Sequence, residues 1–294
     1  MLIAACSGTE SDEQPSSAGG RQARQLTITE MTTGESTRAT LSADGDELSA
    51  LWTAGDKLSY CNLSALTQDY YSGETAPTWG ALTAITTAST SSFEGSVVCS
   101  KGDKLAVVYP AATFGWADSD EAQYTLTLSG QDGTLSTLAS RYHYVYGLAT
   151  VTAADEANAT ATMPKMKSLL TVCRFSFKDE ATDEAILPVS LDISYAADGL
   201  DGNADTYPQT ATVTAGIDQS SVAAKANTSS TQHLTITPTT PQTEMYVALL
   251  PTGGQRTFRF TVTDSDNNTY TGTARATLNA GEYVEATGLK LTRI

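Results

Sequence analysis

Hydrophobic and polar side chains alternate at every second position along much of this chain. The segment 257–263 is the clearest case, with Phe258, Phe260 and Val262 on one side and threonine or arginine between them. Similar alternation occurs in three further segments: 25–31, 57–61 and 189–195. Because successive side chains of a β-strand point to opposite faces, this pattern predicts strands with one buried face. Long helical periodicities are missing, so we expect an all-β fold.

Two segments are apolar without interruption and predict strands that are buried on both faces. They are Leu105–Tyr109, followed by Pro110, and Met245–Leu250, followed by Pro251. Proline suits these positions because it lacks the N–H group that a strand ladder needs. In contrast, the stretch 72–92 is rich in Thr, Ser, Ala and Gly, and it predicts a long surface loop.

The stretch 48–62 predicts two short strand pieces around a tight turn. Leu51 and Trp52 form an apolar anchor before the turn 54–56. Gly55 suits that turn because glycine adopts positive φ angles that other residues avoid. Alternation resumes directly after the turn, as expected for a half-buried strand.

A chain of 294 residues has room for about two domains. The basic and apolar lead-in 164–170 precedes a new strand pattern at 172–177, which places a junction near residue 162. The predicted division is a signal remnant and flexible tether at 1–24, an N-terminal β-sandwich at 25–162 and a C-terminal β-sandwich at 163–294.

The charge balance is strongly acidic, with 33 Asp and Glu against 17 Lys and Arg and a net charge of −16. A chain with this balance is a poor partner for a nucleic-acid backbone, so we expect no nucleic-acid binding. Cys61, Cys99 and Cys173 each lie inside an apolar run, which favours buried thiols over a disulfide.

Few residues in the chain suit catalysis or metal binding. His143 and His233 are its two histidines, neither accompanied by a nucleophile or zinc motif, and we place His143 at a surface or strand position. The acidic segment 201–205 could converge on calcium, but Asp, Asn and Gly also favour turns, which is the better account. We therefore expect no enzyme activity, cofactor or metal.

The N-terminus resembles the end of a lipoprotein signal. Small residues at positions 4–5 precede Cys6, which is the pattern around a cysteine that becomes lipidated. The segment 7–20 is rich in Ser and Gly and carries an acidic cluster, as in a flexible tether. We expect Cys6 to carry a lipid anchor in the outer membrane; the alternative is a cysteine without this role.

Several short motifs occur in an order that resembles the fimbrillin-like family, the pilin subunits of anaerobic Gram-negative bacteria. The first is Trp-x-x-Gly-Asp at 52–56, followed by an alternating strand. Three more follow: Phe-x-Gly at 93–95 with a buried run ending in Tyr-Pro at 109–110, then the segment 126–131, and Leu-x-Ala-Gly-x-Tyr at 278–283. The resemblance covers roughly Leu26 to Leu291, and it is specific as a set rather than motif by motif.

The resemblance implies two tandem transthyretin-like β-sandwich domains with Greek-key-type connections, as in type V pilins. It implies a structural or accessory subunit of a cell-surface fimbrium that serves adhesion, either a pilin assembled by donor-strand exchange or a tip or anchor component. The implied partners are other fimbrial subunits, joined by strand addition. In this family a trypsin-like protease cuts after an arginine that follows the first strand, and Arg38, followed by Ala39, matches that position. Arg24 is a rival site, as is Arg21, and Arg38 could equally be a solvated strand residue.

Two other classes of function stay open on the sequence. One is a surface lipoprotein that binds glycans or host proteins, for which Trp79 and Trp116 are the natural contacts. These tryptophans could instead anchor loops to the core, which we consider the stronger interpretation. A secreted hydrolase is a distant third.

Overall fold

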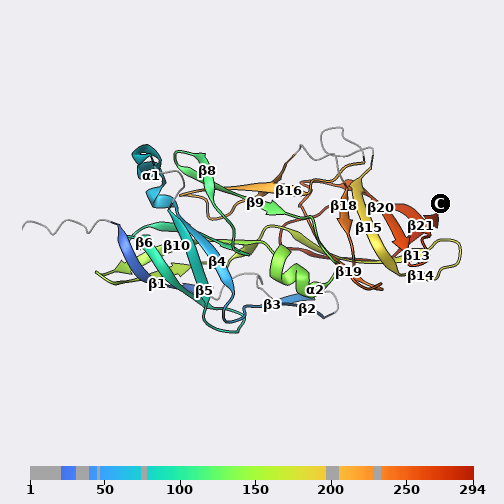
Figure 1. Cartoon of the computed structure of the whole chain (residues 1–294), viewed down its shortest axis with the longest axis horizontal. Helices are drawn as coiled ribbons and strands as arrows, with labels where there is room; N and C mark the ends of the chain where they lie inside the picture. The colour runs from blue at the N-terminus through green and yellow to red at the C-terminus, as the bar shows by residue number, and fades with distance from the viewer. Residues whose placement is uncertain (1–20, 31–39, 45–46, 74–77, 197–204, 228–232) are drawn as a thin grey trace, which may run out of the picture.

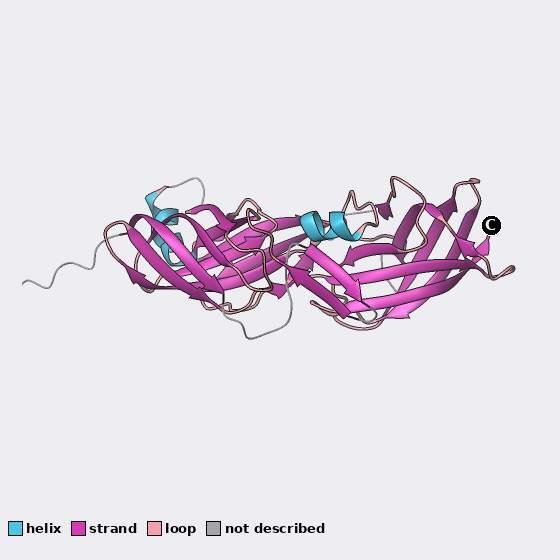
Figure 2. Ribbon diagram, turned by 90° about the horizontal axis from the view of Figure 1, so that it is seen from below, coloured by secondary structure: helices cyan, strands magenta, loops and turns pink. Residues whose placement is uncertain are grey.

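The computed structural model describes residues 21–30, 40–44, 47–73, 78–196, 205–227 and 233–294. It is nearly all β, with two β-sandwich domains arranged end to end in an elongated molecule (Figure 2). The first strand lies toward one end and the C-terminus at the other (Figure 1). The predicted all-β fold with two sandwich domains is confirmed.

The N-terminal domain is built on a sheet that closes on itself. Its strand order is β11-β1-β6-β5-β4-β7-β10-β12, and β11 also pairs with β10, which completes a barrel. The strands are β1 (Gln22–Glu30), β4 (Lys57–Asn62), β5 (Trp79–Ala84), β6 (Ser92–Cys99), β7 (Lys104–Tyr109), β10 (Val145–Ala154), β11 (Asn158–Met163) and β12 (Lys167–Ser168). The pairing of β1 with β11 is parallel, and every other pairing in the sheet is antiparallel.

Trp52 lies fully buried in the core of this barrel. Its ring meets Phe93 and Tyr109 edge-on, with centroid distances of 5.0 and 5.4 Å. The chain then turns through Gly55, whose φ of 98° lies in the left-handed region. The turn and the anchoring role of Trp52 are therefore as predicted, whereas Leu51, the other residue of the predicted anchor, is 45% exposed.

The apolar strand β7 divides its side chains between two cores. Leu105, Val107 and Tyr109 belong to the barrel core, and Ala106 and Val108 belong to a second, larger core. This confirms the prediction of a strand buried on both faces.

A smaller sheet joins the two halves of the chain. It has the order β17-β16-β9-β8 and consists of β8 (Gly115–Asp118), β9 (Glu121–Thr127), β16 (Thr210–Gly216) and β17 (Ala224–Ala226). Strands β9 and β16 pair antiparallel from Thr127↔Thr210 to Glu121↔Gly216, across the predicted junction near residue 162. The larger core likewise takes residues from both halves.

The C-terminal domain follows the order β14-β13-β22-β21-β20-β15-β18, with β19 also paired to β13. The strands are β13 (Thr171–Asp179), β14 (Ala185–Ile186), β15 (Pro188–Tyr195), β18 (Leu234–Ile236), β19 (Met245–Leu249), β20 (Arg256–Asp264), β21 (Thr269–Ala276) and β22 (Tyr283–Arg293). Strand β13 runs parallel to β22. Phe258, Phe260 and Val262 of β20 are buried as predicted.

Some local predictions were wrong. The predicted loop at 72–92 contains β5, whose small side chains conceal a strand that buries Leu82 and Ala84. His143 is buried rather than at the surface, directly after a helical segment. The sequence pattern also missed the helical segments, which are η1 (Leu63–Ala65), α1 (Leu66–Ser72), α2 (Leu135–Thr137) and η2 (Leu138–Tyr142). The first predicted strand piece of 48–62 is present as part of β3 (Glu47–Leu51), which pairs with β2 (Thr40–Asp44) in a small hairpin.

The three described cysteines are free and buried, as predicted. Burial raises the pKa of the Cys173 thiol to about 12, and that of Cys61 further still. Both thiols therefore stay protonated at neutral pH.

Candidate functional site

Strand β1 lies between two strands that come from distant parts of the chain. On one side it pairs antiparallel with β6, from Gln22↔Cys99 to Thr29↔Ser92. On the other side it pairs in parallel with β11, from Gln25↔Asn158 to Glu30↔Met163. Withdrawal of β1 would therefore open the barrel and leave two unpaired strand edges.

Two side chains of β1 fill the barrel core from this position. Leu26 and Ile28 are completely buried. Burying two aliphatic side chains of this size contributes about 3–6 kcal/mol. The space they occupy would become an apolar groove if β1 left.

Arg24 belongs to β1 and not to a tether in front of it. The strand begins at Gln22, three residues before the segment that the alternation predicts. The Arg24 side chain is 6% exposed, and its guanidinium donates hydrogen bonds to the backbone oxygens of Asp155, at 2.6 Å, and of Cys99. Because proteases cut exposed, extended chain, this arginine is shielded as long as β1 stays in the sheet.

An ion pair holds the chain just before β1. Arg21 Nε donates to Asp103 Oδ2 at 3.0 Å, and Arg21 Nη2 donates to the backbone oxygen of Ser64 at 2.5 Å. Asp103 is itself buried and accepts further hydrogen bonds from Asn62 Nδ2, at 2.8 Å, and from the Ser100 backbone N–H, at 3.0 Å. The rival cleavage residue Arg21 is thus also engaged with the barrel.

The other predicted site residues lie outside the described part of the chain. These are the lipidation residue Cys6 and the processing residues Arg38 and Ala39. The structure brings Arg24 to the barrel and leaves the other three untested.

Exposed aromatic side chains occur on α1 and at the start of β5. Trp79, at the start of β5 and not in a loop, is 44% exposed, while Trp116 in β8 is half-buried and packs partly on the larger core. The Tyr70 ring of α1 packs edge-on against that of Trp116, with the centroids 5.4 Å apart. The neighbouring Tyr71 is 76% exposed. Neither tyrosine is among the contacts predicted from the sequence, although two adjacent aromatic residues in a polar stretch are a readable signal.

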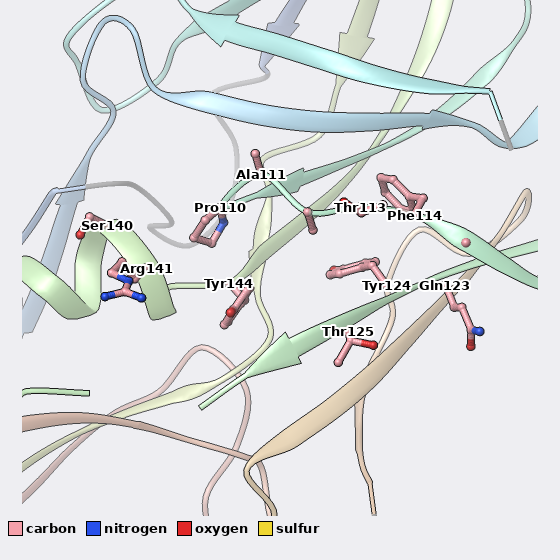
Figure 3. Close-up of a pocket in the computed structure, with 12 residues that line it drawn as sticks. Pro110, Ala111, Thr113, Phe114, Gln123, Tyr124, Thr125, Ser140, Arg141 and Tyr144 are labelled. Atoms are coloured by element: carbon pink, nitrogen blue, oxygen red, sulfur yellow. The ribbon is translucent and has the colours of Figure 1, made fainter. Parts of the chain in front are cut away.

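A pocket of about 640 Å³ lies beside helix η2. Figure 3 shows Ser140 and Arg141 of η2 on one side, Tyr124 and Thr125 of β9 on another, and the segment 110–115 between them. Sequence reasoning missed this pocket because its lining comes from three separate segments.

The described residues contain no group of three or more His, Cys, Asp or Glu side chains placed to hold a metal ion. Asp205, from the predicted acidic turn, instead pairs with Arg259. None of the helices among the described residues has the length and apolar character needed to cross a bilayer.

No protein-family model matches the chain, and no curated protein matches it either. Among solved structures, two Bacteroides proteins, each described as a "putative cell adhesion protein", are similar to it. The one from Bacteroides uniformis is 17% identical with a TM-score of 0.51, over 94% of this chain and 96% of its own. The one from Bacteroides eggerthii is 12% identical with a TM-score of 0.37, over 92% and 88%.

A third similar structure is the shaft pilin SpaA from Lactobacillus rhamnosus GG. It is 9% identical with a TM-score of 0.30, over 93% of this chain and 98% of its own. The likeness to the Bacteroides uniformis protein shows a shared fold over nearly the whole of both chains. The other two are too weak to support a conclusion.

Proposed function

We propose that this protein is a subunit of a cell-surface fimbrium, assembled by strand exchange and used in adhesion. The observation that carries the proposal is the position of β1, which fills the barrel core with Leu26 and Ile28 and closes it between β6 and β11. The fold shared with the Bacteroides uniformis protein, described as a "putative cell adhesion protein", supports it. So do the fimbrillin-like motifs of the sequence.

The proposed mechanism begins with cleavage after Arg38. The fragment that carries β1 then leaves, and its departure exposes two strand edges beside the apolar space of Leu26 and Ile28. A strand from the next subunit pairs with those edges and fills the space with its own alternating apolar side chains. Backbone pairing supplies the affinity, and the shape of the space selects the partner strand.

Limited trypsin digestion with mass spectrometry tests this mechanism. We expect the first cut at Arg38, because Arg24 is buried and Arg21 is held by Asp103. The cut protein should form oligomers whose size increases with concentration. Arg38→Ala should block both results, and Arg275→Ala, at an exposed arginine of β21, should block neither.

The opposite result would be a folded protein that is cut first at Arg21 or Arg24 and stays monomeric at every concentration. Strand exchange would then be excluded for this chain.

The same proposal includes an outer-membrane lipid anchor at Cys6. With a complete signal peptide in front of the chain, the protein should partition with outer membranes, and Cys6→Ser should release it. If the Cys6→Ser protein stays on the surface at the normal level, the anchor assignment is wrong.

A second candidate is a surface-anchored binding module for glycans or host proteins. The exposed rings of Tyr70, Tyr71 and Trp79 favour it, because large exposed aromatic groups mark contact surfaces. Binding to a glycan array that Trp79→Ala abolishes, while Ile85→Ala preserves it, would support this candidate. Without such loss, the aromatic group has no binding role.

A further inference from the structure

The pocket beside η2 has the properties of a small-ligand site and is independent of β1. Its volume of about 640 Å³ lies within the roughly 300–1,000 Å³ typical of such sites. None of its lining residues belongs to β1, β6 or β11. One wall is β9, the strand through which the two halves of the chain pair, and ligand sites are frequent where domains meet.

The charge of the lining differs from that of the whole protein. The chain carries 33 acidic residues, yet none of the residues that line the pocket is acidic. Arg141 is the charged residue of the lining. The charge on the lining is therefore positive in a protein that is acidic overall, which favours an anionic ligand at this pocket.

Arg141 is exposed and available for a ligand. Among the residues whose side chains the structure describes, no carboxylate pairs with it, and its guanidinium carbon lies 5.7 Å from the centroid of the Tyr142 ring. The turn that carries Arg141 is fixed by a hydrogen bond from the His143 backbone N–H to the Leu138 oxygen at 2.9 Å. This widened helical turn is of a kind that often occurs at functional sites.

The rest of the lining combines neutral polar groups with three aromatic rings that are almost fully buried. Phe114, Tyr124 and Tyr144 are 3%, 2% and 7% exposed and belong to the larger core, so they close the pocket but present little surface to a ligand. The hydroxyl groups of Thr113 and Thr125 belong to exposed residues. The lining thus offers a ligand one cation and several hydroxyl groups (Figure 3).

We propose that this pocket binds a sugar acid, such as the terminal uronic or sialic acid unit of a glycan. The guanidinium of Arg141 pairs with the sugar carboxylate through two parallel N–H···O bonds. The sugar hydroxyls form hydrogen bonds with the exposed hydroxyl groups of Thr113 and Thr125. A neutral sugar would leave the cation unused, and a flat apolar ligand would leave the hydroxyls unused.

The test is calorimetric titration of the full chain with glucuronate and with the methyl glycoside of N-acetylneuraminate. Galactose and the methyl ester of glucuronate are the uncharged comparisons. We expect Arg141→Gln to weaken binding of the acids by about tenfold or more, and Arg141→Lys to have a smaller effect because lysine keeps the charge without the fork. Arg275→Gln, which makes the same charge change at an exposed position of β21, should leave binding unchanged.

Thermal unfolding of each variant checks that the fold is intact, since Arg141 has no ion pair among the described residues. Three results would overturn the proposal: no heat of binding with either acid up to about 10 mM, equal binding of the uncharged comparisons, or unchanged binding by Arg141→Gln. The proposed fimbrial role is judged separately, since digestion at Arg38 and oligomer formation involve β1 and not this pocket.

Discussion

The two domains begin in the same way but hold their first strands differently. Strand β1 runs parallel to β11, the strand that completes the barrel, and β13 runs parallel to β22, the last strand of the chain. Within residues 22–29, β1 buries two apolar side chains, Leu26 and Ile28. Strand β13 buries four, from Val172, Cys173, Phe175 and Phe177.

Ion pairs add to the difference. Arg174 of β13 pairs with Glu244 at 2.9 Å and with Glu285 of the neighbouring β22 at 2.6 Å. At β1, the corresponding ion pair is that of Arg21 with Asp103, and Arg21 lies just before the strand. Strand β13 is therefore held by more buried apolar side chains and more ion pairs than β1, although each runs parallel to a neighbouring strand.

The largest expected effect comes from breaking the packing on β13. The Phe260 ring lies 5.3 Å from that of Phe175 and 5.9 Å from that of Phe177. Phe260→Ala should lower the free energy of unfolding by about 3–5 kcal/mol, measured by chemical denaturation. Thr261→Ala, on the opposite face of β20, should cost much less, and equal losses would contradict the observed register.

Truncation of a core side chain in β1 should lower the free energy of unfolding by less, and only as long as β1 stays in the barrel. Leu26→Ala should destabilise the intact chain by about 2–4 kcal/mol, because it leaves a cavity in the barrel. Thr29→Ala, at an exposed position of β1, is the control. After cleavage at Arg38 and loss of β1, Leu26→Ala and the parent protein should unfold alike; a persisting difference would show that β1 is retained.

Two native cysteines, one beside β1 and one in β13, allow local opening at the two strands to be compared without any mutation. Cys99 faces the barrel core and pairs with Gln22 of β1, and Cys173 lies in β13. Departure of β1 should speed alkylation of Cys99 by about tenfold or more, while Cys173 stays protected, because labelling follows local opening. Mass spectrometry reads both sites, and equal rates at the two would argue against selective release of β1.

The smallest expected effect concerns the carboxyl groups of Asp155 and Asp183, whose pKa values are both lowered but by different kinds of hydrogen-bond donor. Hydrogen bonds from the backbone of Asn158 and Ala157 lower the pKa of Asp155, at the turn before β11. Hydrogen bonds from Lys178 and Lys290 lower that of Asp183. Each group stabilises the fold above its unfolded pKa, and this stabilisation is lost as the pH falls through the folded value.

Salt should act on these two groups differently. It screens the lysines, so the pKa of Asp183 should rise toward its ordinary value while that of Asp155 changes little. Side-chain carboxyl NMR at low and high ionic strength measures both. A shift of equal size at the two residues would disprove the assigned causes.

The sequence predicted the elements that follow one simple pattern. Alternation identified β20, and a continuous apolar run identified β7, because side-chain burial alone decides those strands. The alternation pattern predicted the start of β1 too late. A charged residue such as Arg24 reads as exposed in a sequence, but here it is buried because backbone oxygens accept its hydrogen bonds. The pattern did not reveal β5, because its alanine, glycine and threonine residues differ little in hydrophobicity.

The candidate sites were less predictable for a different reason. The pairing of β9 with β16 joins segments more than eighty residues apart, and no local pattern contains that information. The pocket at Arg141 likewise depends on three segments that meet through the fold. The role of β1 as a first strand that fills the core could be anticipated from the family resemblance. The contacts by which Arg21 and Arg24 fix it to the barrel could be seen only in the structure.

The small sheet has a mechanical consequence for a molecule of this shape. Strand β9 is rooted in the first half of the chain and β16 in the second, and β16 runs along the long axis (Figure 1). A pull on the two ends would load the pairs from Thr127↔Thr210 to Glu121↔Gly216 together in shear, in addition to the single covalent connection before β13. The two domains should therefore resist stretching and bending as one rigid unit and should not move independently about a flexible linker.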